Sequence, residues 1–210
     1  IPLVGGTGDG GKVSVNGTVY EDADVYAFVK NNGGKVAVYK ENLYKPMPGY
    51  RFIASNTDRS RFYVGELNGK SSKQAYMDAL HISESNIINQ TFHNPLGKMN
   101  GQDICIISLK EVSGNGLCCY RQVNDSDVLV LLEEQDYNEI LDETLQRIRR
   151  DFNHISGVFS INCVFRYLLF SQEHHMEDYL KTMSTLGDHA GLIGFGEHYN
   201  QQFVNQTMTC

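Results

Sequence analysis

The chain lacks the long apolar run that a membrane-spanning helix requires. Such a helix needs about 20 consecutive apolar residues, and no stretch of the 210 residues approaches that length. An excess of positive charge is also missing, because 18 Lys and Arg stand against 25 Asp and Glu, giving a net charge of −7. Nucleic acids and anionic membranes are bound through basic patches. We therefore expect no nucleic-acid partner and no membrane insertion.

Cysteine is sparse, and its arrangement gives neither a disulfide framework nor a zinc motif. The count is odd, two of the residues are adjacent, and the chain contains no CxxC and no HExxH sequence. Buried, reduced thiols of this kind are typical of cytosolic proteins. We therefore expect a cytoplasmic protein that holds no metal or other cofactor. The five residues are Cys105, Cys118, Cys119, Cys163 and Cys210.

The N-terminus shows neither an initiator Met nor a signal peptide. Ile1 leads directly into PLVGGTGDGG, so we expect a piece excised from a longer chain. Glycine-rich loops can cradle phosphates. Here no Lys-Ser/Thr pair follows and the next residues resemble a strand, so a flexible turn is the favoured interpretation.

What the chain does contain is the composition of a packed globule, with 41% hydrophobic and 20% charged residues. Apolar spacing predicts helices over residues 71–80, 136–153 and 176–186. Between and around them the patterns are those of strands, and the mixture indicates an α+β fold of mostly antiparallel sheets packed with a few helices.

Most of the remaining chain is predicted to form strands, joined by turns and one linker. Residues 12–40 are predicted to be β-structure with a hairpin at Asn31–Gly34, and the proline-containing residues 44–50 are predicted to be a linker. Three strands at meander spacing are expected over 104–109, 117–123 and 128–132. Further strands are expected over 61–67, 158–163, 190–195 and 202–209.

The C-terminal quarter carries the candidate site. Two apolar, strand-like runs, which begin at Gly157 and Gly191, each end in polar groups that an apolar core would not select. If the runs lie side by side in a sheet, these groups converge at one end and form a ligand site. They are Cys163, Arg166, Glu197, Asn205 and Thr207.

Arg166 is the leading candidate for ligand binding. A guanidinium matches a carboxylate through two parallel hydrogen bonds, and it stays charged, so a buried one needs a partner. That partner could be Glu197, which would make the pair structural, or it could be the carboxylate of a ligand. If Glu197 is left over, it could accept from a ligand ammonium, and the two residues would clamp a zwitterion.

The remaining candidates have simpler explanations. Asn205 offers a donor and an acceptor, although a local turn or sheet-edge hydrogen bond is favoured. Thr207 is explained by its β-propensity. Cys163 beside an Arg suggests a nucleophile of lowered pKa, but no His is placed near it as a base. We therefore favour a buried thiol that packs as a small hydrophobe.

Six segments of the chain follow one another in a recognisable order: Arg61–Leu67, Ala75-Tyr76, Phe92–Gly97, Cys163-x-x-Arg166, Gly194–Glu197 and Asn205–Thr207. In their order and spacing, these segments resemble the FIST C domain. The N-terminal glycine-rich stretch and the strands after it resemble the end of a FIST N domain. The resemblance implies domains at 1–50, the remnant of FIST N, and at 51–210, a FIST C domain.

The resemblance implies a sensory module of microbial signal-transduction proteins that binds a small ligand such as an amino acid or another small carboxylate. The expected partners are that ligand, the rest of FIST N and an output domain. An exposed sheet edge would also allow a homodimer. We expect no enzyme. The alternatives are a haem-based nitric-oxide sensor, with His93 or His198 as axial ligand, and a Cys163-dependent enzyme.

Overall fold

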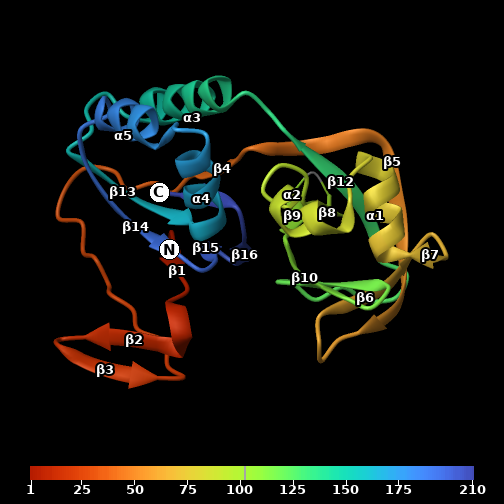
Figure 1. Ribbon diagram of the computed structural model, residues 1–210. Coiled ribbons are helices and arrows are strands. Elements are labelled where there is room, and N and C mark those ends of the chain that lie inside the picture. The colour runs from red at the N-terminus through yellow and green to blue at the C-terminus, as the bar shows by residue number, and fades with distance from the viewer. Residues whose placement is uncertain (102) are drawn as a thin grey trace. The chain divides into compact units, whose positions relative to one another are not determined.

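The computed structural model describes residues 1–101 and 103–210, which divide into two compact units. The first unit combines Ile1–Asn42 with Tyr137–Cys210, and the second is the continuous stretch Leu43–Asp136 (Figure 1). Helices and mostly antiparallel sheets occur in both units, so the expected α+β class is confirmed.

The second unit is built on one strongly curved run of antiparallel pairings, with the strand order β10-β11-β6-β5-β12-β8-β9. Its apolar core lies between these strands and the helix α1, whose Ala75, Tyr76 and Ala79 are buried. The elements are β5 (Tyr44–Asp58), β6 (Tyr63–Leu67), β7 (Lys70–Ser71), α1 (Ser72–Leu80), η2 (Glu84–Asn86), α2 (Ile87–Gln90), β8 (Leu96–Asn100), β9 (Asp103–Ile107), β10 (Leu109–Ser113), β11 (Gly116–Cys119) and β12 (Val128–Glu134).

The first unit contains the candidate site. Its main sheet has the order β14-β13-β17-β4, in which β13 and β14 are parallel, and a smaller sheet has the order β1-β15-β16. The elements are β1 (Val4–Gly6), η1 (Asp9–Gly11), β2 (Lys12–Val15), β3 (Thr18–Glu21), β4 (Lys40–Asn42), α3 (Tyr137–Asp151), β13 (Gly157–Cys163), α4 (Val164–Gln172), α5 (Met176–Ser184), β14 (Asp188–Gly194), β15 (Glu197–Tyr199), β16 (Gln202–Val204) and β17 (Thr207–Thr209).

The helices form where apolar residues recur at helical spacing. α3 buries Leu141, Leu145 and Ile148 on one face, and α5 buries Tyr179 and Met183. Both helices were predicted within two residues of their observed ends. The helix α4 was not predicted, because its apolar run VFRYLLF continues that of β13 without a polar break.

Three strand predictions were wrong. Residues 44–50 are not a linker but the start of β5, where the prolines lie at an irregular point of the pairing with β12. No hairpin forms around Asn31–Gly34, and no strand occupies residues 22–39. The strands β9, β11 and β12 are not consecutive neighbours, since β9 pairs with β8, β11 with β6 and β10, and β12 with β5 and β8.

Candidate functional site

Strand β13 separates two sets of polar side chains in the first unit. In a β-sheet, residues paired across strands share a face, and successive residues alternate between faces. Asn162 is paired with Met208, and Met208 with Glu41, so these three side chains lie on one face. Ile161 is paired with Thr209 on the other face, and alternation places Cys163 and Thr207 there too.

Arg166 belongs to the face of Asn162. The helix α4 begins directly after β13, and Arg166 lies in its first turn with a relative exposure of 1%. Its Nη2 donates to Oε1 of Glu41, which is also buried. The guanidinium carbon lies 4.6 Å from the ring centroid of Phe170 and 5.4 Å from that of Tyr179. The two rings and the carboxylate enclose the charge.

Several polar atoms around Arg166 are left without a hydrogen-bond partner among the described residues. They are Nε and Nη1 of Arg166, Oε2 of Glu41 and Oδ1 of Asn162. A buried polar atom in this state costs about 1–3 kcal/mol, and more if it is charged. The arginine cluster, defined as Arg166, Glu41, Asn162 and Tyr179, therefore offers unused donors and acceptors together.

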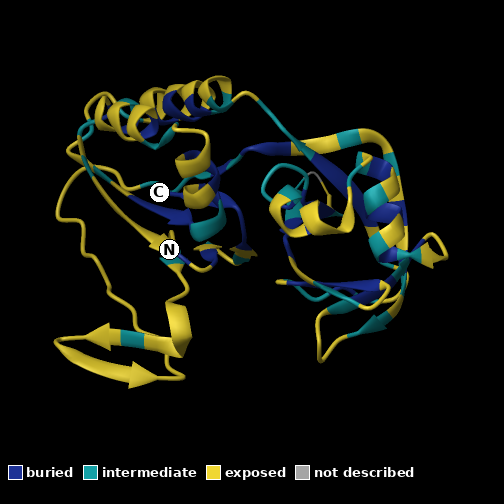
Figure 2. Cartoon of the chain, in the orientation of Figure 1, coloured by how far each residue is buried: buried dark blue, intermediate teal, exposed yellow. Residues whose placement is uncertain are grey.

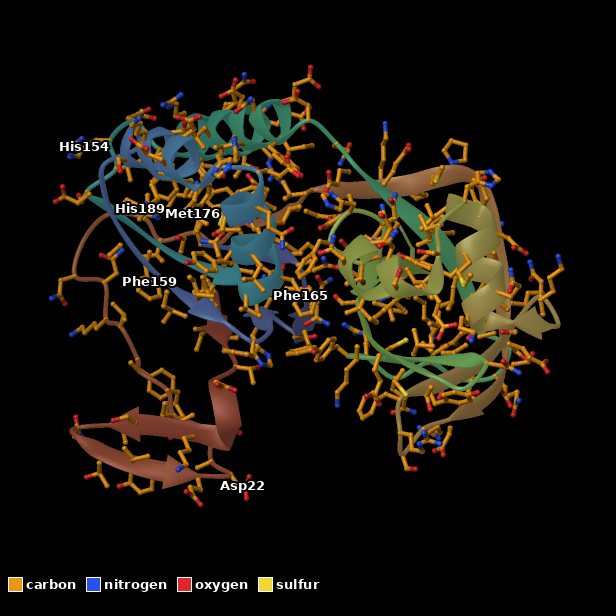
Figure 3. The ribbon with its side chains drawn as sticks, viewed as in Figure 1. Asp22, His154, Phe159, Phe165, Met176 and His189 are labelled. Carbon is orange, nitrogen blue, oxygen red and sulfur yellow. The ribbon has the colours of Figure 1, made fainter. Side chains whose placement is uncertain are left out.

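A chain of hydrogen bonds orients Asn162 within this cluster. Its Nδ2 donates to the Tyr179 hydroxyl at 3.0 Å, which leaves Oδ1 as the atom without a partner. Burial is the main cause of the raised pKa of Tyr179, and Ser160 lies within hydrogen-bonding reach of the same hydroxyl. Ser160 Oγ is also 2.8 Å from Nε2 of His189, which is half-buried and labelled in Figure 3. Burial lowers the pKa of His189.

Glu197 is the centre of the second set, on the opposite face. It begins β15, is fully buried, and accepts a hydrogen bond of 2.7 Å from Thr207 Oγ1. Burial raises the pKa of Glu197 to about 7, although hydrogen bonds from Thr207 and Cys163 and the attraction of Arg166 act in the opposite direction. Its Oε1 has no hydrogen-bond partner among the described residues.

Cys163 lies against this carboxylate and is not an activated nucleophile. Burial, with the negative charge of Glu197, raises the pKa of the thiol to about 12. A catalytic cysteine needs a lowered pKa, which a neighbouring cation or helix N-terminus supplies. Cys163 does stand at the N-terminus of α4, where backbone hydrogen bonds from Gln206 and Phe165 lower the pKa of the thiol, but burial and the negative charge of Glu197 outweigh them, so the thiol stays protonated at neutral pH.

Asn205 completes the second set. It is 7% exposed, and Nδ2 has no partner among the described residues. The residue lies beside Gly196, where an added Cβ would come within 3.3 Å of Asn205 Oδ1. Gly196 immediately precedes Glu197, so Asn205, Glu197, Thr207 and Cys163 form one group, which we call the glutamate cluster.

Of the predicted site residues, the structure thus brings four together and separates the fifth from them. Arg166 does not pair with Glu197, and the two lie on opposite faces of the sheet. The Arg166 partner Glu41 was missed, as were Asn162 and Tyr179. Asn162 could have been found as a polar residue inside the apolar strand GVFSINC, whereas nothing in the local sequence marks Glu41.

The two histidines considered for haem have separate surroundings. His93 belongs to the second unit, where Nδ1 lies 3.0 Å from Oε1 of Glu134. His198 is exposed in the first unit, with its ring 5.1 Å from that of Phe203. Within the described residues, no group of three or more His, Cys, Asp or Glu side chains is placed to hold a metal ion.

The first unit thus combines mixed sheets with two buried polar clusters, within a chain of the α+β class. The family model of the FIST C domain matches residues 73–200, more than half of the chain. The chain therefore belongs to the FIST C domain family, a family of sensory domains in signalling proteins. The match extends over parts of both units and includes Arg166 and Glu197, whereas Glu41, Asn205 and Thr207 lie outside it.

Neither the curated proteins nor the solved structures contain a match. None of the helices in the described part of the chain has the length and apolar character needed to cross a membrane. The predicted domain limits, 1–50 and 51–210, stay a prediction.

Proposed function

We propose that this chain is the ligand-binding part of a sensory protein, without chemistry of its own, and that the arginine cluster binds an amino acid or another small carboxylate. The observation that carries the proposal is the guanidinium of Arg166, which is 1% exposed yet has only Nη2 bonded to Glu41. Its Nε and Nη1, which lie on the two different donor edges of the planar group, have no hydrogen-bond partner among the described residues. Each of the two donors can give one charge-assisted hydrogen bond to a ligand carboxylate.

The unused acceptors of the cluster favour a ligand that also carries a donor. Oε2 of Glu41 and Oδ1 of Asn162 both lack a partner within the described residues. A ligand ammonium or amide could donate to them while its carboxylate binds Arg166. A zwitterion would therefore satisfy both halves of the cluster, whereas a simple carboxylate would satisfy only the guanidinium.

Ligand entry requires the cluster to open. Two surface hollows of the first unit, of about 530 and 390 Å³, are lined by none of its residues. We propose that α4 moves to admit the ligand, because Arg166 is in its first turn and forms one side of the cluster. Sensing needs two states with different affinities for the ligand, and opening of α4 would provide them for an output domain to read.

The test is a thermal-shift screen of amino acids and small carboxylates. A ligand at a hundredfold excess over its Kd stabilises the protein by about 2.7 kcal/mol. In a chain of this size, each kcal/mol of added stability raises the Tm by roughly 2–4 °C. We expect at least one zwitterionic compound to raise the Tm by several degrees. A weaker shift is expected for the same compound without its amino group.

The variant must remove the site without leaving a buried charge. Arg166→Met alone would leave Glu41 unpaired, at a cost of about 3–5 kcal/mol. Arg166→Met with Glu41→Leu replaces the pair by apolar groups, which is often nearly neutral, and should abolish the ligand-induced shift. Arg150→Ala, an exposed arginine on α3, is the matched control and should retain it. A shift that survives in the double variant would exclude the arginine cluster as the site.

A further inference from the structure

The segment between β3 and β4 is strand-like in sequence but forms no strand. Residues 24–30 read DVYAFVK, with β-branched and aromatic residues between charged ends. In the structure all of them are exposed, as Figure 2 shows for the trace between these strands. The largest exposed fractions are 78% for Tyr26, 83% for Phe28 and 88% for Val29. Leaving such side chains in water forgoes their burial energy.

An unpaired strand edge lies in the same unit. β14 is the end strand of the main sheet, and Ala190–Ile193 are exposed on both of its faces. Leu192 and Ile193 have exposed fractions of 46% and 45%, and Phe159 on β13 has 50%. No Lys, Arg or Pro lies within β14 to discourage pairing, as such residues do on protected edges.

Backbone hydrogen bonds tie the start of the segment to one end of β14. Thr7 N donates to Gly196 O at 2.9 Å, and Phe195 N donates to Thr7 O at 2.8 Å, just beyond the C-terminal end of β14. Four residues after Thr7, Gly11 O accepts from Asp22 N at 2.9 Å. The chain therefore enters the segment near the Gly194 end of β14.

Side chains tie the far end of the segment to the other end of β14. Lys35 Nζ lies 3.2 Å from Asp151 O, and the Tyr39 hydroxyl donates to Asp151 Oδ2 at 2.6 Å. Asp151 ends α3, six residues before Gly157, which is paired with Asp188 at the start of β14. Between its two ties, the segment therefore runs in the direction opposite to β14.

We propose that Asp24–Lys30 is an edge strap, a segment of this chain that closes on β14 as an additional antiparallel strand. Both segments have seven residues, which spans about 20 Å in a strand. The register that pairs opposite charges places Lys30 opposite Asp188 and Asp24 opposite Gly194. A parallel strand would place Asp24 against Asp188, where two like charges repel.

This register also matches the side chains on both faces. Tyr26 and Phe28 fall opposite Leu192 and Ala190, on the face where Phe159 is exposed (Figure 3). The two rings already lie on one side of the segment, with centroids 5.3 Å apart. On the helix side, the small Ala27 falls opposite Gly191. Closing the strap would therefore bury the exposed aromatic residues against an apolar strip of the sheet.

Hydrogen exchange of the complete chain tests the strap. We expect alternate backbone amides within residues 24–30 to exchange on the order of tenfold or more slowly than in an unstructured peptide. The amides of Asn32 and Gly34, in the bend after the strap, are the internal control and should exchange fast. Fast exchange throughout residues 24–30 would overturn the proposal.

Two sets of variants separate the strap from unspecific protection. Phe28→Asp should remove the protection, whereas Val36→Asp, a matched change at an exposed residue outside the strap, should not. Lys30→Glu should weaken the protection, and adding Asp188→Lys should restore it, which tests the register. Failure of this rescue would overturn the register.

A second copy of the chain could instead supply the strand. Protection that rises with protein concentration, together with a dimer in light scattering, would show strand exchange between copies and overturn closure within one chain. Concentration-independent protection in a monomer would support the strap.

Discussion

At the scale of single residues, the unusual group is the carboxyl of Glu197. It is fully buried with one oxygen bonded to Thr207 and the other without a partner among the described residues. Its pKa of about 7 lies above the ordinary value of 4.5 chiefly because burial disfavours the charged form. The folded chain therefore binds this proton more tightly than the unfolded chain does.

The first prediction follows from that difference in pKa. Stability from the protonated Glu197 should be fully present below about pH 4.5 and lost as the pH rises through 7, a loss of ~3 kcal/mol. Glu197→Gln should remove this dependence and be more stable than the original chain at pH 8, but not at pH 4. Urea unfolding of both proteins at pH 4 and pH 8 measures these free energies of unfolding. An unchanged pH profile in Glu197→Gln would contradict the raised pKa.

A second prediction concerns Cys163. Because burial raises the pKa of the thiol to about 12, iodoacetamide should label it very slowly in the folded chain at pH 7 and readily in denaturant. Peptide mass spectrometry identifies the labelled cysteine, and Cys105, which is only half-buried, serves as the comparison. Fast labelling of Cys163 in the folded chain would revive the enzyme alternative.

The sequence anticipated the residues of the site better than their pairing. A lone Arg in an apolar run must find a partner if it is buried, and Arg166 is buried with one. The partner, Glu41, is 125 residues away in sequence, and only the pairing of β4 with β17 places it on the correct face. The separation of Arg166 from Glu197 likewise depends on a strand-to-helix switch at Cys163 that the apolar pattern does not reveal.

At the scale of elements, α1 begins with Ser71 as its N-cap. Ser71 Oγ accepts from Gln74 N at 3.3 Å and donates to Asn115 O at 2.5 Å. Ser71→Ala should therefore cost about 1 kcal/mol of stability, measured by urea unfolding. Ser85→Ala, at an exposed serine whose hydroxyl lies 2.9 Å from that of Ser83, should cost much less. Equal effects would show that the cap does not contribute.

Elements with strong periodicity were predicted well, and elements decided by long-range pairing were not. α3 follows from Leu141, Leu145 and Ile148 alone, because a helix satisfies its own backbone. β5 contains Pro46 and Pro48, which usually exclude a strand, yet it pairs with both β6 and β12. The opposite error occurred at residues 25–29, whose strand propensity is high but whose backbone has no partner strand in the structure.

At the scale of the whole molecule, the second unit is one continuous stretch with its own core. The core cluster of buried residues runs from Phe52 to Leu131 and lies wholly within Leu43–Asp136. We predict that this stretch, produced alone, folds and unfolds cooperatively. Urea unfolding followed by circular dichroism and fluorescence measures this, and the two signals should coincide. A broad transition without a midpoint would show that the unit depends on the rest of the chain.

The position of Glu41 in the chain has a further consequence. Only Asn42 separates it from Leu43, where the second unit begins, so the ion pair with Arg166 lies beside the peptide link between the units. A ligand that bonds both the guanidinium and Oε2 of Glu41 would hold this carboxylate, and with it the short strand β4, more firmly in place. The backbone itself could then carry the signal, as a tether whose anchoring depends on whether the guanidinium is occupied.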